Sequence, residues 1–393
     1  MTALEGVRIL DLSRLGPGPF GTMILADMGA EVIKIEEADE RGAIGRDLFV
    51  RPGATPEEEE RALSLNFIAR NKKSIVLNLR LAEAKEVFYK LAGTADVLYE
   101  NYRPGVVKRL GIDYETISKI NPRIIYCSMS GYGQDGPYKD LPGHDPNFRA
   151  VAGLLAAETD MNGRPITSGV TSADTSGALH SVIGILCALR SRDKTGEGQY
   201  VDISFADSAL NLGSLLLGHY MAFKQVPKPR DIQLIQSAWE TKDGKYIVSA
   251  PVESYFWERF CRALGLEEFI PLQYSTGKKY EEMVSTIAAK VRTKTRDEWF
   301  EIMKQANTCV SPVLTFEEVL NDPQMLHRNM IMELNHPTQG KVKQLGFPIK
   351  LSKTPAKFKS FAPKLGQHTD EILRELRYTG DQVKALRKAG AVK

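Results

Sequence analysis

The chain has 393 residues, of which 42% are hydrophobic, and its formal net charge is +3. This length allows one large domain or two ordinary ones, and the nearly balanced charge excludes a protein that wraps nucleic acid. The four cysteines are far apart and form no CxxC pair. The sequence therefore predicts neither a zinc site nor a disulfide framework, and it fits a reducing cytoplasm.

Targeting and membrane signals are not evident. The N-terminus lacks a basic segment followed by an apolar core, so we expect no signal peptide. No apolar stretch approaches the length that spans a bilayer, so we expect no membrane partner.

The first half of the chain alternates short β-rich runs with helical patterns. The strands expected here are residues 7–12, 31–36, 74–78, 97–100 and 124–128. Helical patterns lie between them, one of them at residues 82–91. Repeated βαβ units of this kind imply a parallel sheet, so the fold class is α/β.

The second half begins with a long, mostly apolar helix expected at residues 175–192 and a strand at 200–204. Residues 227–230 (Pro-Lys-Pro-Arg) are typical of a linker. From Trp239 to about Leu320 the pattern changes to a hairpin and amphipathic helices, which indicates a smaller second domain. The expected segments are 1–225 for the large domain, 226–328 for the small domain and 329–393 for a C-terminal part.

A Gly-rich turn follows the first strand. Residues 16–21 match G-x-G-x-x-G and open a helix, and Glu36 ends the next strand, which is the pattern of a dinucleotide site. Three residues separate the strand from Gly16, however, and Pro17 and Pro19 lack the N–H groups that would hold a pyrophosphate. The pattern therefore argues against NAD or FAD.

Asp174 directly precedes the long helix, where an N-cap is the ordinary role of an aspartate. A carboxylate at a helix N-terminus is also stabilised in its ionised form, which suits a base or a nucleophile. The small residues at 171–177 would leave room for a ligand.

His144 lies in a loop rich in proline and glycine, where a histidine is either an exposed structural residue or an acid/base group near neutral pH. Glu253 interrupts an apolar stretch that begins at Ile247. It is either an exposed carboxylate at a strand end or the group that orients an imidazole. The remaining histidines show no ligand spacing, so no metal site is expected.

Eight short motifs follow one another in a specific order along nearly the whole chain. They are residues 6–11, 17–20, 25–30, 70–74, 100–105, 130–137, 194–199 and 366–373. With Asp174 and His144, they resemble the class III CoA-transferase (CaiB/BaiF) superfamily, and within it the α-methylacyl-CoA racemases.

This resemblance implies a Rossmann-like large domain built from both chain ends and a smaller α+β middle domain. It also implies a homodimer of two interlocked subunits, with each active site between the large domain of one subunit and the small domain of the other. The implied ligand is an acyl-CoA, whose CoA is part of the substrate, and no further cofactor is implied.

The resemblance also assigns the chemistry. Asp174 matches the aspartate that is acylated in the transferases and acts as an acid/base in the racemases. His144 falls in Gly-His-Asp-x-Asn, the racemase form, and Glu253 matches the glutamate that pairs with that histidine. The backbone N–H of Asp145 would stabilise the enolate.

For CoA itself, the resemblance implies two groups of residues. Those expected to contact the phosphates are Arg80, Arg103 and Arg109, and those expected along the adenine and pantetheine path are Leu15, Leu77, Asn101 and Tyr102. Glu37 departs from the family, since many members place an arginine there against the adenine; Arg41 and Arg46 are the candidate replacements.

The function expected from these residues is inversion of the α-carbon of a 2-substituted acyl-CoA, with His144 and Asp174 on opposite faces of that carbon. The first alternative is transfer of CoA between carboxylic acids through an acyl anhydride at Asp174. The second is a non-catalytic acyl-CoA-binding protein.

Overall fold

The computed structural model describes residues 1–37, 50–160, 162–225 and 237–393. The chain folds into two compact units. Unit 1 consists of residues 1–156, 166–214 and 328–393, and unit 2 of residues 157–165 and 215–327. The linker expected at 227–230 lies outside the described residues.

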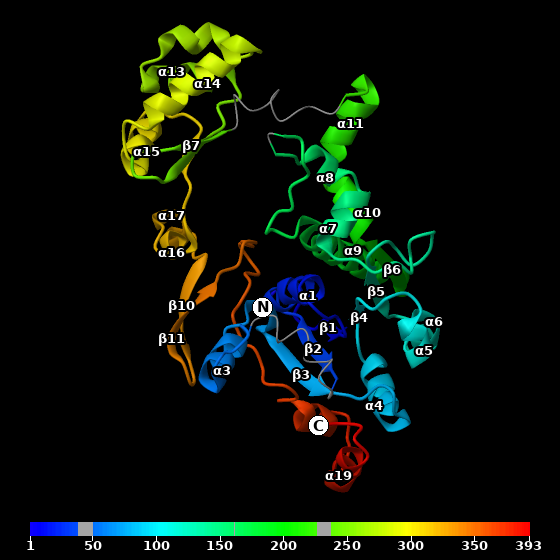
Figure 1. Cartoon of the computed structure of the whole chain (residues 1–393). Helices are drawn as coiled ribbons and strands as arrows, with labels where there is room; N and C mark the ends of the chain where they lie inside the picture. Colours follow the sequence, from blue (N-terminus) through cyan, green and yellow to red (C-terminus); the bar gives the residue numbers. More distant parts are fainter. Residues whose placement is uncertain (38–49, 161, 226–236) are drawn as a thin grey trace. The chain divides into compact units, whose positions relative to one another are not determined.

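Unit 1 is built on a six-stranded sheet in the order β3-β2-β1-β4-β5-β6, and every neighbouring pair is parallel (Figure 1). The strands are β1 (Arg8–Asp11), β2 (Glu31–Glu36), β3 (Lys72–Val76), β4 (Val97–Glu100), β5 (Ile125–Ser130) and β6 (Gln199–Ser204). This is the doubly wound order of dinucleotide-binding folds, in which ligands bind where the strand order reverses. The α/β fold class expected from the sequence is confirmed, and four of the six strands differ from their expected bounds by one or two residues.

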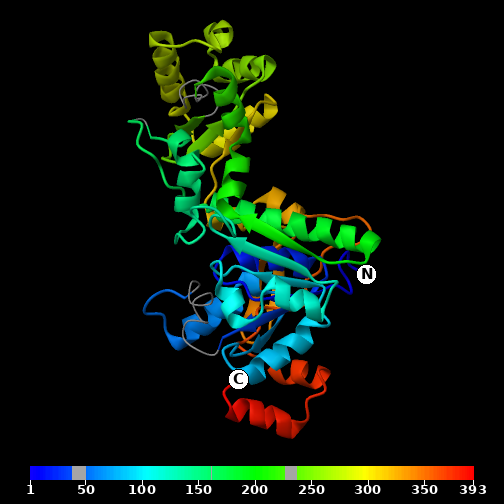
Figure 2. The same cartoon turned by 90° about the vertical axis from the view of Figure 1, so that its right-hand side faces the viewer.

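Helices cover both faces of this sheet. Strands β1 to β5 are mostly buried, whereas the edge strand β6 is mostly exposed. Neighbouring residues in β1 show the alternation. Ile9 packs with α1 (Pro17–Asp27) and α9 (Ser172–Thr195) on one face, and Leu10 packs with α4 (Ala82–Ala92) and α18 (Thr369–Glu375) on the other. Figure 2 shows the C-terminal helices, in red, beside the sheet. The helices of unit 1 are α1 (Pro17–Asp27), α3 (Pro56–Ser64), η1 (Phe67–Ala69), α4 (Ala82–Ala92), α5 (Val106–Leu110), α6 (Tyr114–Ile120), α7 (Asp145–Val151), α9 (Ser172–Thr195), α10 (Phe205–Leu212), α18 (Thr369–Glu375) and α19 (Gly380–Lys388), with α8 (Leu154–Ala157) at its boundary.

The C-terminal segment returns to the free edge of the sheet at β3. The backbone N–H of Ser74 donates to His368 Nδ1 (3.1 Å), and the N–H of His368 donates to the Ser74 carbonyl (2.9 Å). Leu77 forms a bridge with Val392 beyond the strand. The motif at 366–373 therefore holds the chain end against the edge that would otherwise stay unpaired.

Helix α9 begins at Ser172, three residues earlier than expected, so Asp174 lies in its first turn and not at its cap. The prediction that Asp174 precedes the helix is wrong. With 24 residues, α9 is also long and apolar enough to cross a membrane by length and composition alone, which corrects the expectation that no stretch reaches that length. One of its faces packs in the core of unit 1 at Ile185 and Ala188, as a core helix would.

Unit 2 has a small antiparallel sheet in the order β7-β8-β9. Its elements are α11 (Ser214–Phe223, whose first residue belongs to unit 1), β7 (Ser237–Glu240), β8 (Tyr246–Ser249), α13 (Ser254–Leu264), η2 (Glu267–Leu272), α14 (Lys278–Val291), α15 (Arg296–Gln305), β9 (Val310–Pro312), α16 (Phe316–Val319) and α17 (Pro323–His327). Its core forms around three buried tryptophans, Trp239, Trp257 and Trp299. The hairpin β10 (Ile331–His336) and β11 (Gly340–Leu345) then leads back into unit 1.

Candidate functional site

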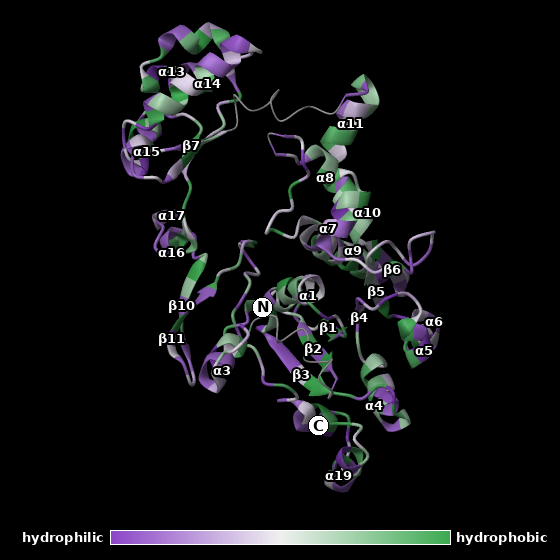
Figure 3. Ribbon diagram, viewed as in Figure 1, coloured by the Kyte–Doolittle hydropathy of each residue, from purple (hydrophilic) through white to green (hydrophobic). Residues whose placement is uncertain are grey.

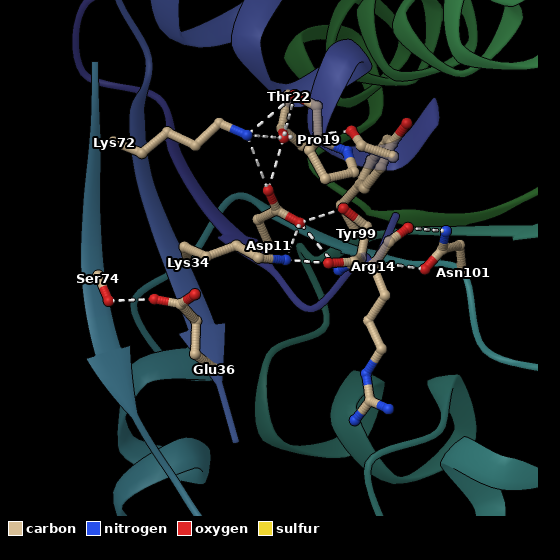
Figure 4. Close-up of polar contacts among 12 residues, drawn as sticks. Asp11, Arg14, Pro19, Thr22, Lys34, Glu36, Lys72, Ser74, Tyr99 and Asn101 are labelled. Carbon is tan, nitrogen blue, oxygen red and sulfur yellow. Dashed lines mark hydrogen bonds and ion pairs between the residues drawn. The ribbon is translucent and has the colours of Figure 1, made fainter. Parts of the chain in front are cut away.

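The strand order of the sheet reverses between β1 and β4, and the loops that follow these two strands are tied to each other. The N–H of Arg14 donates to Asn101 Oδ1 (2.7 Å), and Asn101 Nδ2 donates to the Arg14 carbonyl (2.7 Å). Figure 4 shows this reciprocal pair. Asn101 thus joins the two loops at the place where such sheets bind ligands.

An open cavity lies at this end of the sheet, and its empty space, open solvent included, is about 680 Å³. Its lining comes from the loop after β1, the start of α1, the end of β2, the loop after β4, the start of β3, η1 with the residue before it, and one residue of the C-terminal segment. The lining residues are Ser13, Arg14, Leu15, Pro19, Lys34, Ile35, Glu36, Glu37, Asn66, Ile68, Ala69, Lys72, Tyr102 and Pro363. Leu15 and Tyr102, both expected on the CoA path, therefore line one cavity.

Arg14 brings positive charge to this cavity. Its guanidinium donates to Glu37 Oε1 and lies over the Tyr102 ring, 4.8 Å from the centroid. Glu37 also faces Arg80, at 4.0 Å. The carboxylate at position 37 thus orients an arginine that comes from another loop. The two candidate replacements, Arg41 and Arg46, lie outside the described residues.

A buried charge cluster forms around Asp11, and two of its members, Lys34 and Lys72, also line the cavity. Figure 4 shows the polar contacts of this cluster. Lys72 Nζ donates to Asp11 Oδ2 (3.2 Å), Thr22 Oγ1 (2.7 Å) and the Pro19 carbonyl (2.9 Å). Lys34 Nζ contacts the other Asp11 oxygen (3.2 Å) and the Ser13 carbonyl. Two lysine side chains therefore hold the turn at 13–19 in place, because they donate hydrogen bonds to two of its carbonyl groups.

The electrostatics of this cluster follow from its burial and charges. Burial alone would raise the pKa of Asp11. The ammonium groups of Lys34 and Lys72 and the hydrogen bonds from Ser13 and Thr22 together outweigh burial and hold that pKa below its usual range. Burial lowers the pKa of Lys72 to about 8, although Asp11 opposes the change. Since lysines hold this turn by its carbonyls and Pro17 begins α1, the Gly-rich motif is a structural turn.

The other residues expected to bind CoA are dispersed. Leu77 is fully buried in the core, so its side chain does not line the cavity. Arg80, Arg103 and Arg109 are exposed on the same unit. Arg109 lies in the last turn of α5, and Arg103 lies just before that helix.

His144 and Asp174 stand at the starts of two helices of unit 1. His144 is the N-cap residue of α7, where its backbone N–H donates to Asn147 Oδ1 (3.0 Å). Gly143 allows this turn, because a Cβ there would lie 2.7 Å from the Phe148 ring. Gly-His-Asp-x-Asn is thus a helix-start motif that presents an exposed imidazole.

Asp174 is half-buried in the first turn of α9, and its proton affinity is altered. Burial raises the pKa of Asp174 to about 6, the negative charge of Asp145 adds to this effect, and His144 opposes it. The imidazole and the two carboxyl groups are therefore near enough to interact. A carboxyl group with a pKa close to neutrality can be used as acid, base or nucleophile.

The small residues after Asp174 serve packing, in contrast to the expectation that they leave room for a ligand. Ser176 and Gly177 are buried, and a Cβ at Gly177 would collide with the Phe205 ring. Helix α10 thereby packs closely against α9.

Glu253 lies in unit 2, as the exposed N-cap residue of α13. The strand before it ends at Ser249, so Glu253 is not a strand-end residue as its first interpretation had it. Its charge acts on Cys309, whose pKa is raised by burial and by Glu253. The pairing of Glu253 with His144 stays a prediction, since the two residues belong to different units.

The sequence reasoning missed Arg14, Lys34 and Lys72. The signal for Lys72 was present, because a lysine inside a β-rich run is buried only where a carboxylate meets it. For Arg14 no signal in the sequence distinguishes it from any loop arginine. Within the described residues, no group of three or more His, Cys, Asp or Glu side chains could hold a metal ion.

The chain matches the family model described as CoA-transferase family III over residues 4–369. The chain belongs to CoA-transferase family III. It is 34% identical over 400 residues to succinyl-CoA:glutarate CoA-transferase of Homo sapiens, across 99% of this chain and 90% of that protein. It is 32% identical over 422 residues to formyl-CoA:oxalate CoA-transferase of Shigella sonnei, across 100% of both chains.

The fold agrees with that of a family III structure. A CAIB/BAIF family protein from Brucella suis superposes with a TM-score of 0.82 at 29% identity, and the match covers 95% of this chain and 99% of that one. The resemblance to the superfamily is thus confirmed. The names of the two similar enzymes support the transferase alternative better than the racemase interpretation that the sequence favoured.

Proposed function

We propose that this family III protein transfers CoA between two carboxylic acids through an acyl anhydride at Asp174. The observation that carries the proposal is the half-buried Asp174 carboxyl group in the first turn of α9, beside Asp145 and His144. The similar enzymes act on short acids, as their names state, so short dicarboxylates are the first substrates to test.

The chemistry needs a carboxylate nucleophile. An oxygen of Asp174 attacks the thioester carbonyl, the carbon–sulfur bond breaks, and CoA leaves as a thiolate, which gives the mixed anhydride. The thiolate attacks the Asp174 side of the anhydride, releases the first acid and leaves CoA on Asp174. The carboxylate of the second acid attacks this thioester, which forms a second anhydride and frees the CoA thiolate. The thiolate then attacks the acyl side of that anhydride, which forms the new acyl-CoA and frees Asp174. The backbone N–H of Asp145, which has no intrahelical acceptor at that position, is proposed to stabilise the oxyanion.

The cavity at the switch point is proposed to hold the nucleotide end of CoA. Leu15, Ile68 and Ala69 offer apolar surface, and Arg14 and Tyr102 offer a flat charged platform. A guanidinium stacks on aromatic rings and pairs with phosphates, so Arg14 could contact both the adenine ring and the phosphates of the nucleotide. The exposed Arg80, Arg103 and Arg109 are proposed to meet the phosphates.

A homodimer is part of the proposal. Along α9, Leu179, Ile183 and Leu186 are 44%, 55% and 41% exposed, at helical spacing on one face. Helices α10 and α11 also show hydrophobic stretches in Figure 3, and Leu215 of α11 is 88% exposed. Apolar stripes of this kind mark surfaces that a partner covers. A dimer would allow Glu253 to reach the site from a second subunit, and the cytoplasm is the proposed location.

Racemisation is the second candidate, and the observation that favours it is the His144 imidazole near Asp174. With the acyl-CoA α-carbon between them, one group would remove the proton and the other would return it to the opposite face. The acid/base pair would then never become acylated.

One experiment separates these functions. The protein is incubated with succinyl-CoA and glutarate in heavy water, treated with borohydride, and digested for mass spectrometry. A transferase yields glutaryl-CoA and a reduced Asp174, and Asp174→Asn yields neither. Exchange of the α-hydrogen of a 2-methylacyl-CoA without acceptor acid, and without a label on Asp174, would instead establish the racemase. Binding of CoA with neither reaction would establish a binding protein.

A further inference from the structure

The side chain of Asp145 joins the two helices that carry His144 and Asp174. One of its oxygens, Oδ2, accepts from the backbone N–H of Ala173 (2.7 Å) and from that of Asp174 itself (3.2 Å). These N–H groups belong to the first turn of α9. The side chain of the N-cap residue Thr171 accepts no hydrogen bond from this turn. Asp145 therefore caps a helix that starts 27 residues further along the chain.

The second oxygen of Asp145 faces its own helix. Oδ1 lies 3.6 Å from Nη1 of Arg149, one turn along α7. Asp145 and Arg149 are 2% and 1% exposed, so both charges are removed from water. A buried carboxylate that is held on both oxygens has little freedom to move, and the backbone of its neighbour His144 is held with it.

We propose that Asp145 acts through its side chain as a positioning residue, which ties the start of α7 to the start of α9 and so fixes His144 relative to Asp174. This inference rests on the proposed function only in taking Asp174 as the reacting group. It applies equally to anhydride formation and to proton transfer, since both need a carboxyl group held in place.

The charge of Asp145 has a second consequence for Asp174. Burial is the main reason why the pKa of Asp174 rises to about 6; Asp145 adds to it and His144 opposes it. Removal of the Asp145 charge should therefore lower the pKa of Asp174. A residue with a purely structural capping role would leave this titration unchanged.

Two substitutions separate position from charge. Asp145→Asn keeps an oxygen that can accept from both N–H groups but removes the charge, whereas Asp145→Ala removes both. Asp140→Asn is the matched control, because Asp140 is an exposed carboxylate in the same loop. The readouts are kcat, in whichever reaction the protein performs, and the ¹³C titration of Asp174, assigned with Asp174→Asn.

We expect Asp145→Ala to lose roughly a hundred-fold in kcat, the effect of a misplacement of about 1 Å. Asp145→Asn should lose clearly less and should shift the Asp174 titration and the acid limb of the rate profile to lower pH. Asp140→Asn should change neither. An Asp174 titration that is the same in Asp145→Asn as in the wild type, or full kcat in Asp145→Ala, would overturn the proposal.

The titration does not depend on activity, so it also tests the inference if Asp145→Ala fails to fold. If the protein shows neither transfer nor exchange, the proposed function fails. The shift of the Asp174 titration in Asp145→Asn would still decide whether Asp145 acts on Asp174.

Discussion

Side chains at the ends of strands and helices carry the proposed chemistry of this protein, and local sequence revealed some of them. His144, Asp145 and Asn147 form one helix-start motif, so their spacing predicts a shared structure. Asp174 stands out as a lone aspartate among small residues. Contacts between distant segments, such as the hydrogen bonds from α9 to Asp145, leave no local pattern, because they depend on how α7 and α9 pack.

The same holds for Arg14 and Glu37, which are 23 residues apart in the chain. Glu37 could be noticed as a departure from the family pattern, but its partner could not. Parallel pairing of β1 with β2 places the carboxyl ends of the two strands, which these residues follow, next to each other. The pair is therefore visible only once the register of the strands is known.

The Arg14 platform gives a prediction for CoA recognition. Arg14→Ala should raise the KM for an acyl-CoA about ten-fold, because a stacking and charge-assisted contact is worth on the order of 1 to 2 kcal/mol. The KM for the matching acyl-pantetheine, which lacks the nucleotide, should not change. Steady-state kinetics with both substrates measure this, and Arg262→Ala, an exposed arginine of unit 2, is the control. An equal rise for both substrates would show that Arg14 does not contact the nucleotide.

Helices and strands were largely predictable from the sequence, since hydrophobic periodicity decides them. Their ends were less so: α9 starts at Ser172 because Asp145 caps it from another segment. Several family motifs proved structural. Asp27 at the end of α1 accepts from Arg70 Nε (3.0 Å) and Nη2 (2.6 Å) and from Asn71 Nδ2 (2.7 Å).

This contact also anchors the C-terminal part of unit 1. Asn71 Oδ1 accepts from the N–H groups of Lys359 and Ser360, and Arg70 donates to the Leu345 carbonyl. Asp27 thus joins α1, the start of β3 and the returning chain. Two of the eight motifs that identify the family meet at this one contact.

Removal of Asp27 should be costly to stability. Asp27→Ala leaves the buried Arg70 without its carboxylate, which typically costs about 3 to 5 kcal/mol. Urea unfolding followed by far-UV circular dichroism measures the loss. Tryptophan fluorescence would not report the unfolding of unit 1, because all three tryptophans lie in the core of unit 2. Glu258→Ala, which removes an exposed pair with Arg262 (2.8 Å), should cost less than about 1 kcal/mol; a similar loss in both variants would contradict the prediction.

The whole chain forms two units with separate cores, and the larger one is assembled from three separate segments. The parallel sheet of that unit was predictable from its βαβ pattern. The family resemblance implied that the large domain is built from both chain ends. It did not indicate that the C-terminal segment covers β3, because no periodicity shows which edge a distant segment will cover. Figure 1 shows the two chain ends within unit 1.

The exposed stripe on α9 gives a prediction about assembly. Ile183→Glu places a charge in the centre of the proposed interface and should convert a dimer to a monomer, because a buried unpaired charge costs several kcal/mol. Light scattering coupled to size-exclusion chromatography measures the mass. Ser285→Glu, on an exposed part of α14, should remain dimeric. A wild-type protein that is monomeric, or that partitions into lipid vesicles through α9, would refute the dimer.

The bond between Ser74 and His368 joins residues 294 positions apart. During synthesis, β3 leaves the ribosome long before the segment that covers its edge exists. Unit 2, whose main part is the continuous stretch 215–327, has no such delay. We therefore expect the middle of the nascent chain to fold first, while the larger unit waits with an open sheet edge that chaperones can bind.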